Sequence, residues 1–471
     1  MEGFPSRTTK LFVYSWLKSL FMMPKFHFSN QLLFTAISVL FLFPLQAQKL
    51  TKKERKIAAE VEKNNAEAIQ FLEKVVNINS GTMNPQGVKA TGAVFDAAFK
   101  SIDFKTEWID MPPEMNRAGH LFASIEGNKG KRLLLIGHLD TVFEEDSDFQ
   151  KFEPVNDSVA KGPGANDMKG GDVIILYALK ALRETGLLKD AQIIVALHGD
   201  EESTGKPLSI SRKSIVDAAK RSNVALGFET STGYDNATVA RRGSSGWKVE
   251  VTGKRAHSSG IFNESTGAGA NFELARILHQ FYTDVKGEEL LTFNPGMMLG
   301  GTTIKVEEEK SRGEVFGKSN VVAQSAFANG GLRFISEEQK ESARVKMREI
   351  VANNLPQTSA TISFTDSYPA MRPTEANYAL LKELDQVSRD LGQPAVEAYD
   401  PGKRGAADVS FIAEYVAALD GLGTMGDGAH TPEETVNLNT IEALTKRTAI
   451  LIYRLINEKR SPHPASPKGR S

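Results

Sequence analysis

The sequence predicts an α/β protein with a mainly parallel central sheet, into which a smaller α+β domain is inserted. Three observations support this fold class. Between residues 52 and 242, continuous apolar runs alternate with helical segments, which is typical of a sheet layered with helices. From Gly243 the pattern changes to alternating, half-buried strands interleaved with two amphipathic helices. After Pro369 the first pattern resumes and continues to about Glu458, so the middle segment is an insertion.

The first part opens with an amphipathic helix from Lys52 to Val76, where apolar residues recur at helical spacing among charged ones. Helical periodicity is found again from Gly171 to Leu187. Three continuous apolar runs predict buried strands: Arg132 to Val142, Ala191 to His198 and Asn223 to Phe228. The second helical segment lies between the first two of these runs, as a parallel sheet requires.

The inserted part has the order β-α-β-β-α-β, which predicts a small ferredoxin-like, open-faced sandwich. Its expected strands are Trp247 to Val251, Gly300 to Val306, Asn320 to Phe334 and Ala360 to Phe364. Its expected helices are Ala268 to Tyr282 and Ser336 to Asn354.

The composition excludes several classes of function. The chain has 471 residues, with 57 Lys and Arg, 58 Asp and Glu, and a formal net charge of −1. Without residues 1–47, which hold four basic residues and one acidic residue, the net charge is −4. This balance gives no electrostatic basis for nucleic acid or an anionic membrane as a partner. The chain has no cysteine, so any metal must be held by histidine and carboxylates.

The N-terminal segment predicts export. Lys25 precedes an apolar stretch at 32–45, and the small residue Ala47 stands before a polar switch. A basic start, a short apolar core and a small residue at its end are typical of a signal peptide. We expect cleavage after Ala47, no stable membrane span after processing, and a periplasmic or secreted product. The alternative is a membrane anchor, but this needs about 20 apolar residues, and Pro44 and Gln46 interrupt the stretch.

Two short motifs could present metal ligands. The segment GHLDT leaves the first predicted strand, so His138 and Asp140 point the same way. A carboxylate beside a histidine fixes the tautomer of the ring, as it does around a metal, but a structural histidine at a strand end explains the pair equally well. In GPGANDMKGG, two pairs of glycines allow a tight turn that presents Asp167, although an ordinary loop has the same composition.

Carboxylates also follow the other two predicted strands. Residues 198–203 (HGDEES) place three adjacent carboxylates, including Glu201 and Glu202, at a strand end. Their repulsion is costly unless cations neutralise it, which favours a functional site over a solvated acidic loop. Glu229 follows the third strand, and His430 lies in a glycine-rich loop near the C-terminus. For each of these two residues alone, an ordinary loop position is the simpler interpretation.

Taken together, these residues predict a metal site. In a parallel α/β sheet, ligands bind beyond the carboxyl ends of the strands. All candidate residues except Asp167 and His430 directly follow a predicted strand and therefore lie at this edge. Two histidines and three carboxylates suit zinc, which takes nitrogen and oxygen ligands and usually keeps a position open for water. The candidate ligands are His138, Asp167, Glu202, Glu229 and His430.

Five sequence blocks resemble, in order and spacing, those of metallopeptidase family 20. This is a family of di-zinc exopeptidases that includes aminoacylase, two amino-acid deacylases and glutamate carboxypeptidase. The blocks are GHLDTV, GPGANDMKGG, GDEEST, GFET and GAHTPEE. The resemblance covers about residues 52–458, and it is specific because all five blocks occur together. It implies a zinc-exopeptidase catalytic domain with an inserted lid and dimerisation domain.

The resemblance also implies a role for each residue at the site. It assigns two zinc ions per subunit, held by His138 with Glu229, by Glu202 with His430, and by Asp167 as the bridge. The peptide bond from Asp167 to Met168 is expected to be cis. Asp140 is expected to orient His138, and Glu201 is expected to be the general base that takes a proton from a metal-activated water. Cobalt or manganese could substitute for zinc.

The lid carries three further candidates. His257, in the block GKRAHS, matches a histidine that reaches a neighbouring subunit's active site and stabilises the oxyanion. Asn320 and Arg333 match lid positions that contact substrate. The resemblance thus implies a homodimer formed through the lid. The predicted organisation is a signal peptide at 1–47, a catalytic domain at 48–242 and 370–460, a lid at 243–369, and a disordered tail at 461–471.

The segment from Asp420 to His430 resembles glutamate carboxypeptidases most, so we expect a carboxypeptidase or dipeptidase that releases a C-terminal amino acid. The free carboxylate of its small peptide substrate would be held by an arginine such as Arg333. An N-acyl amino-acid deacylase with the same site is the alternative within the enzyme class. A non-catalytic binding relative is the alternative outside it, although such a protein has no need of Glu201.

Overall fold

The computed structural model describes residues 50–458 of the chain. The predicted signal peptide at 1–47 and the predicted tail at 461–471 lie outside the described residues. Within the described part, no helix is both long enough and apolar enough to cross a membrane.

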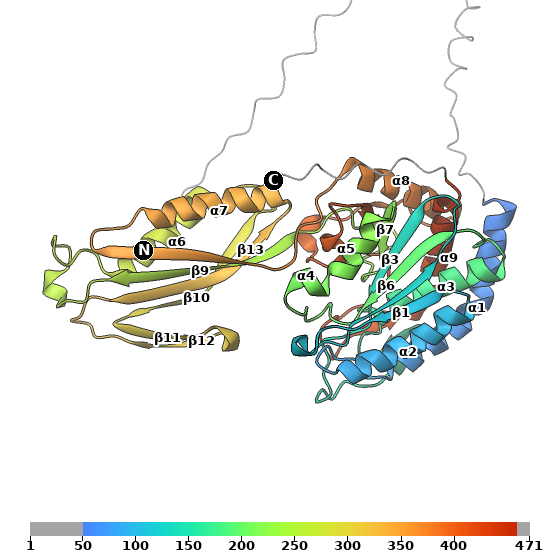
Figure 1. Cartoon of the computed structure of the whole chain (residues 1–471), viewed down its shortest axis with the longest axis horizontal. Helices are drawn as coiled ribbons and strands as arrows, with labels where there is room; N and C mark the ends of the chain where they lie inside the picture. Colours follow the sequence, from blue (N-terminus) through green and yellow to red (C-terminus); the bar gives the residue numbers. More distant parts are fainter. Residues whose placement is uncertain (1–49, 459–471) are drawn as a thin grey trace, which may run out of the picture. The chain divides into compact units, whose positions relative to one another are not determined.

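The central sheet has six strands in the order β1-β2-β6-β3-β7-β16 (Figure 1). Strand β3 (Arg132–His138) lies between β6 (Gln192–His198) and β7 (Val224–Gly227) and is parallel to both, and β16 (Ala417–Leu419) is parallel to β7. At the other edge, β2 (His120–Ile125) is antiparallel to β6, and β1 (Lys105–Ile109) is antiparallel to β2. The prediction of a mainly parallel sheet is confirmed.

The strands of this sheet are continuous apolar runs because both of its faces are covered. Leu133 and Leu135 of β3 belong to a core formed with helices that include α1 (Lys52–Val76), α2 (Pro85–Ser101), α3 (Lys169–Glu184), α8 (Glu375–Asp390) and α9 (Leu438–Leu455). Leu134 and Ile136 belong to a second core, on the opposite face, that includes α5 (Lys213–Lys220) and apolar residues between 407 and 418. The alternation follows from the two-residue period of a strand.

The second sheet has four antiparallel strands in the order β10-β13-β9-β14. These strands are β9 (Gly243–Gly253), β10 (Thr292–Gly301), β13 (Ser325–Phe334) and β14 (Thr358–Asp366). Its helices, α6 (Ala270–Gln280) and α7 (Glu337–Ala352), share an apolar core with β9 and β13. All of these elements lie between residues 243 and 369, and the predicted α+β insertion is confirmed as a fold; its domain boundaries stay predictions.

One predicted strand of the insertion is wrong. The sequence predicted a single strand from Gly300 to Val306, whereas β10 ends at Gly301 and β11 (Thr303–Glu307) pairs with β12 (Arg312–Phe316) in a separate hairpin. The chain leaves the four-stranded sheet at Gly301, where the backbone of the hairpin approaches so closely that a Cβ atom would lie 2.7 Å from the carbonyl oxygen of Phe316. A glycine inside a strand pattern often marks such a close approach.

Several short elements complete the described part. They are a three-stranded sheet of β17 (Thr435–Asn437), β5 (Val159–Lys161) and β4 (Glu153–Asn156), the pair β8 (Asn236–Ala237) and β15 (Glu397–Ala398), helix α4 (Leu208–Ser211), and the helical turns η1 (Pro113–Met115), η2 (Ser258–Gly260), η3 (Phe281–Val285), η4 (Glu308–Lys310), η5 (Pro401–Lys403) and η6 (Asp408–Phe411).

Candidate metal centre

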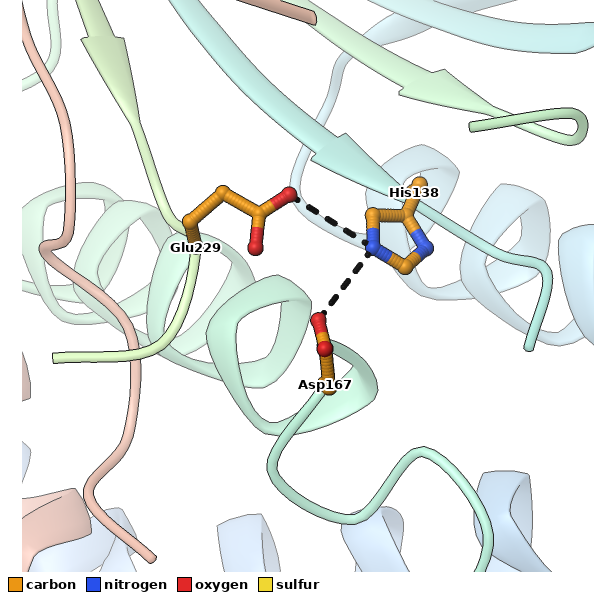
Figure 2. Close-up of side chains that lie close together, drawn as sticks. All are labelled: His138, Asp167 and Glu229. Atoms are coloured by element: carbon orange, nitrogen blue, oxygen red, sulfur yellow. Dashed lines mark ion pairs between the residues drawn. The ribbon is translucent and has the colours of Figure 1, made fainter. Parts of the chain in front are cut away.

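The five predicted ligands come from loops at the carboxyl ends of parallel strands and from two loops beside them. His138 is the last residue of β3, Glu229 lies just beyond β7, and Asp167 lies just before α3, as Figure 2 shows. Glu202 follows β6, and His430 precedes β17. The peptide bond between Asp167 and Met168 is cis, as the family resemblance implies.

The side chains of these residues form two groups that share Asp167. In the first group, Nε2 of His138 lies 3.6 Å from Oδ1 of Asp167 and 3.6 Å from Oε1 of Glu229 (Figure 2). In the second group, Nε2 of His430 lies 3.2 Å from Oδ2 of Asp167 and 3.2 Å from Oε2 of Glu202. The two oxygens of Asp167 thus face different groups, and the three ligand atoms of each group lie within 4.8 Å of one another.

The geometry of both groups fits a metal ion. Zinc binds nitrogen and oxygen at roughly 2.0–2.2 Å with tetrahedral angles, which separates neighbouring ligand atoms by about 3.4 Å. The measured separations of 3.2–3.6 Å bracket this value. Moreover, Nε2 of the buried His138 has no hydrogen-bond partner within residues 50–458, which is costly for a buried ring nitrogen unless a ligand satisfies it. The residues therefore fit two metal ions, one for each group.

The electrostatics point in the same direction, because the carboxylates crowd one another. Burial, together with the charge of Asp167, raises the pKa of Glu229 to about 8. Burial also raises the pKa of Glu202, although its hydrogen bond with His430 opposes this. The carboxylates of Asp167 and Glu202, which accept hydrogen bonds from its ring, raise the pKa of His430 to about 11. Metal ions bound between these carboxylates would offset their mutual repulsion.

Asp140 differs from its predicted role in one respect. The resemblance makes it the residue that orients His138, and it does so through its main-chain oxygen, which lies 3.0 Å from Nδ1 of His138. Its nearer carboxylate oxygen is 3.5 Å from that nitrogen. The carboxylate instead accepts hydrogen bonds from the backbone N–H groups of Glu201 and Glu202 and from the hydroxyl of Thr82. One residue therefore fixes both the ring of His138 and the loop that carries the predicted base.

Glu201 lies beside the two groups without belonging to either of them. It lines a small cavity together with His138 and Glu229. Burial raises the pKa of its carboxyl group well above the usual range, and the charge of Glu229 adds to this effect. The hydroxyl of Tyr368 donates to its main-chain oxygen at 2.8 Å. A carboxyl group that is buried beside a site and held by its backbone can serve as a general acid and base.

The sequence analysis assigned no role to Glu434. Its carboxylate accepts three backbone N–H groups of the loop that presents Asp167: Oε2 accepts from Gly164 at 3.1 Å, and Oε1 accepts from Asn166 at 2.9 Å and from Asp167 at 3.0 Å. The only signal in the sequence was its position four residues after His430 in the block GAHTPEE.

A buried network supports the other side of the site. The guanidinium group of Arg212 donates to Oδ1 of Asp408 at 2.7 Å and forms an ion pair with Asp200. Asp408 also contacts Nδ1 of His198, the last residue of β6. The network ties the loop after β6 to the segment around Asp408, which lines the same cavity as Glu201.

The three predicted lid residues are not brought to the metal groups by any contact among the described residues. His257 is exposed, and its ring contacts Ser259. Asn320 is exposed, and its main-chain oxygen accepts from the N–H of Ser258. Arg333 is exposed on β13, opposite Ser244 of β9. Their predicted roles in substrate binding and across a dimer stay predictions.

Known protein families and sequences resemble this chain over most of its length. Residues 134–454 match the family model described as Peptidase family M20/M25/M40. Carboxypeptidase G2 of Pseudomonas sp. (strain RS-16) is 28% identical over 392 residues, which cover 82% of this chain and 89% of that protein. A probable succinyl-diaminopimelate desuccinylase of Staphylococcus aureus (strain MSSA476) is 26% identical over 293 residues, 60% of this chain and 68% of that protein.

Solved structures share the fold. Aminopeptidase PepT of Bacillus cereus ATCC 10987 superposes with a TM-score of 0.67 at 16% identity, covering 83% of this chain and 99% of that chain. A peptidase of Bacillus subtilis, described as dinuclear metal-binding, superposes with a TM-score of 0.58 at 12% identity and covers 84% of this chain and 99% of its own.

Proposed function

The chain belongs to peptidase family M20/M25/M40, and from that premise we propose that it is a zinc-dependent carboxypeptidase or dipeptidase that releases a C-terminal amino acid. The family establishes an enzyme that hydrolyses peptide or amide bonds. The observation that carries the proposal is the pair of ligand groups that share Asp167, with the half-buried side chain of Glu201 beside them.

The residues that would hold the metal ions are His138 with Glu229, Glu202 with His430, and Asp167 between them. Zinc suits this set of nitrogen and oxygen donors, and cobalt or manganese could take its place. When bound, the ions polarise the scissile carbonyl and lower the pKa of water.

Glu201 is the proposed general base. Its carboxylate takes the proton of the attacking water and delivers it to the nitrogen of the leaving amine, so one group acts as base and then as acid. Its raised pKa suits this exchange, because a carboxylate whose pKa burial has raised accepts a proton more readily than an ordinary glutamate does. Asp140 and Tyr368 keep the group in place through the backbone of Glu201.

Relatives support two substrate classes. Carboxypeptidase G2 is similar over most of both chains and favours release of a C-terminal amino acid, whose carboxylate Arg333 would hold. The desuccinylase supports the alternative, an N-acyl amino-acid deacylase with the same site, over a smaller part of the chain. The non-catalytic alternative has no support among these relatives.

A substrate panel tests this proposal. Purified protein loaded with zinc is assayed against dipeptides, folyl-glutamate and N-acetyl amino acids, with the released amino acid measured directly. We expect turnover of dipeptides or folyl-glutamate. Deacylation alone would replace the carboxypeptidase with the deacylase, and no turnover of any amide would reject both.

Two further properties belong to this proposal. Export by a signal peptide cleaved after Ala47, to the periplasm or the medium, rests on the composition of residues 1–47. A homodimer formed through the 243–369 segment, with His257 acting at the partner's site, rests on the family resemblance. N-terminal sequencing of the mature protein and light scattering test these two properties.

A further inference from the structure

The two segments that join the insertion to the rest of the chain run side by side. The chain enters the insertion just before β9 and leaves it through residues 366–371, the returning linker. The N–H of Ser244 donates to the main-chain oxygen of Tyr368 at 2.8 Å. Arg241 and Met371 exchange two backbone hydrogen bonds, at 2.9 and 3.0 Å. The returning linker is thus paired along its length with the segment by which the chain entered.

Helix α7 of the insertion holds the returning linker. Three of its side chains, spaced by three and then four residues, lie on one face of the helix: Glu337, Lys340 and Arg344. Nη2 of Arg344 donates to Oδ1 of Asp366 at 2.5 Å, and the ammonium group of Lys340 lies 3.3 Å from the same oxygen. The carboxylate of Glu337 accepts the N–H of Ala370 at 3.4 Å. The helix therefore contacts the linker both before and after Tyr368.

The hydroxyl of Tyr368 joins this linker to the loop that carries the proposed base. It donates to the main-chain oxygen of Glu201 at 2.8 Å and lies 2.6 Å from the hydroxyl oxygen of Thr204. Because its one proton goes to Glu201, the hydroxyl of Thr204 donates to Tyr368. Thr204 in turn accepts from Nη2 of Arg212 at 3.3 Å. Hydrogen bonds that follow one another in this way polarise and strengthen each other.

The ring of Tyr368 is held as well. It packs against the ring of Phe411, with the two centroids 4.9 Å apart, and the guanidinium group of Arg212 lies 5.4 Å from the same ring of Phe411. Ring and hydroxyl thus contact the loop after β6 and the turn η6, whereas the backbone of Tyr368 belongs to the linker. This side chain is a direct connection between the part held by α7 and the loop of Glu201.

The backbone of Glu201 is held from two sides. Its N–H donates to Oδ1 of Asp140 at 3.0 Å, and its carbonyl oxygen accepts from Tyr368. Asp140 follows a strand of the central sheet, whereas Tyr368 follows the last strand of the insertion. The orientation of this backbone sets the direction of the Glu201 side chain, and a displacement of about 1 Å at a reacting group costs about 100-fold in rate.

We propose that the insertion positions the catalytic base: α7 holds the returning linker, and Tyr368 transmits this hold to the carbonyl of Glu201. Tyr368 is thus a positioning residue of the hydrolytic reaction. Lys340 and Arg344 support it from a helix that carries none of the predicted metal ligands. The inference rests on the proposed function, with Glu201 as the base, and adds that contacts inside the insertion set the rate of the chemical step.

The first test removes the hydroxyl of Tyr368 and keeps its ring. In zinc-loaded Tyr368→Phe, assayed on the best substrate of the panel, we expect kcat to fall by roughly 10-fold, because the base loop loses one hydrogen bond, while KM and zinc content stay the same. Tyr177→Phe is the matched control, since it removes a hydroxyl on α3 that donates to Glu67 at 3.2 Å. Unchanged kcat in Tyr368→Phe would overturn the proposal. Loss of zinc would also overturn it, because it would show a structural role.

A double substitution shows whether Tyr368 acts through Glu201. In Glu201→Gln the base is already absent, so the addition of Tyr368→Phe should leave the residual kcat unchanged. A further fall by the factor that Tyr368→Phe causes in the wild-type background would mean that Tyr368 acts on another group, and would contradict the proposal. Full activity of Glu201→Gln, or no turnover of any amide by wild type, would instead reject the proposed function.

The second test acts from the insertion, and it decides the matter even if Tyr368→Phe does not fold. Lys340→Met keeps most of the aliphatic side chain and removes the charge beside Asp366, so kcat should fall by about 2- to 5-fold with KM unchanged. Lys346→Met, on the same helix, is the matched control, because this ammonium group pairs with Glu288 at 3.0 Å, outside the linker. Melting curves verify that both variants are folded. Wild-type kcat in Lys340→Met would contradict the role of α7.

Discussion

The carboxylate of Glu434 accepts the backbone N–H of Asp167 at 3.0 Å, from a position 267 residues further along the chain. Two more backbone N–H groups of the same loop donate to this carboxylate, so a single side chain holds the loop in place. Asp167 is thereby presented with one oxygen to each ligand group. Burial raises the pKa of Glu434 to about 7, and the three hydrogen bonds oppose this rise.

Replacing Glu434 by Gln should weaken metal binding. The amide has one acceptor oxygen in place of two, so at least one loop N–H loses its partner and Asp167 is held less firmly. We expect zinc affinity to fall by about 10- to 100-fold, as is usual when a group that supports a ligand is changed. Competition with a chromophoric chelator measures this. Glu433→Gln is the matched control, because that side chain is 79% exposed and pairs with Lys161; equal affinities in the two variants would contradict the role of Glu434.

Replacing Glu201 by Gln should separate chemistry from metal binding. The amide cannot take a proton from water, so kcat should fall by about 100- to 10,000-fold while zinc content stays the same. Glu202→Gln gives the contrast, since it removes a predicted ligand and should lower the zinc content as well. Metal analysis and steady-state kinetics on both variants distinguish the two roles. Unchanged turnover in Glu201→Gln would show that another group is the base.

Removal of metal should abolish activity and lower Tm. Without cations, burial and the charge of Asp167 raise the pKa values of Glu202 and Glu229, so the crowded carboxylates destabilise the site. Zinc at 1,000 times its Kd should stabilise the fold by about 4 kcal/mol. The check is a melting curve and an assay after EDTA, and again after zinc is restored. Magnesium serves as the control ion, because it prefers oxygen ligands and should not restore activity; an EDTA-treated protein with full activity would refute the metal centre.

The buried imidazole of His120 should make the protein sensitive to acid. Its Nδ1 accepts the N–H of Gly199 at 3.3 Å, and its Nε2 lies 2.9 Å from the main-chain oxygen of Ser211, so the geometry suits the neutral ring. Burial, together with the charge of His198, whose ring centroid is 4.3 Å away, lowers its pKa to about 3. A proton on Nδ1 would meet the N–H of Gly199.

The sign of the effect follows from proton binding. Between pH 3 and about 6.5 the unfolded chain binds a proton at His120 that the folded protein does not, so the free energy of unfolding rises with pH across this window. Stability is lost as pH falls from 6.5 towards 3. In His120→Gln, the slope against pH should fall by about 1.4 kcal/mol per pH unit, one proton's worth. Urea titrations measure the free energy of unfolding at each pH, and EDTA in the buffer ensures that metal release does not contribute. His279→Gln, at an exposed histidine, is the control. Identical slopes in wild type and His120→Gln would contradict the role of His120.

Replacing His257 by Ala tests the role of this residue in the predicted dimer. If its ring completes a partner's site, His257→Ala should lower kcat without changing zinc content, and light scattering should show a dimer for both proteins. The ring is exposed and contacts Ser259, so the change should leave stability nearly unaltered. His279→Ala, an exposed histidine on α6, is the control for the surface change. A fully active monomeric wild type would remove this role from His257.

The sequence predicted elements whose pattern is strong and local. Helix α1 has the predicted bounds because its apolar positions recur over 25 residues and Thr51 and Glu54 form a capping box at its start. The buried strands β3, β6 and β7 were recognisable as apolar runs. The break at Gly301 was not predictable, because it depends on the approach of the distant backbone of Phe316.

At the metal centre, too, residues with a local sequence signal could be predicted, whereas residues that act through distant contacts could not. His138 and Glu229 could be found because each follows a strand, and the carboxyl ends of parallel strands meet at one edge. Glu434 and Tyr368 could not be assigned roles, because each contacts main-chain atoms of a loop that is far away in the sequence. The role of Asp140 was predicted in outline, while the division between its carbonyl and its carboxylate needed coordinates.

Strand β16, at the edge of the central sheet, is synthesised only after the whole segment that holds the second sheet. His430 and Glu434 come later still. A ribosome that makes this chain from its N-terminus therefore completes the insertion before the residues that close the metal centre exist. A growing polypeptide that has completed the insertion but not yet His430 therefore lacks one of the five predicted metal ligands.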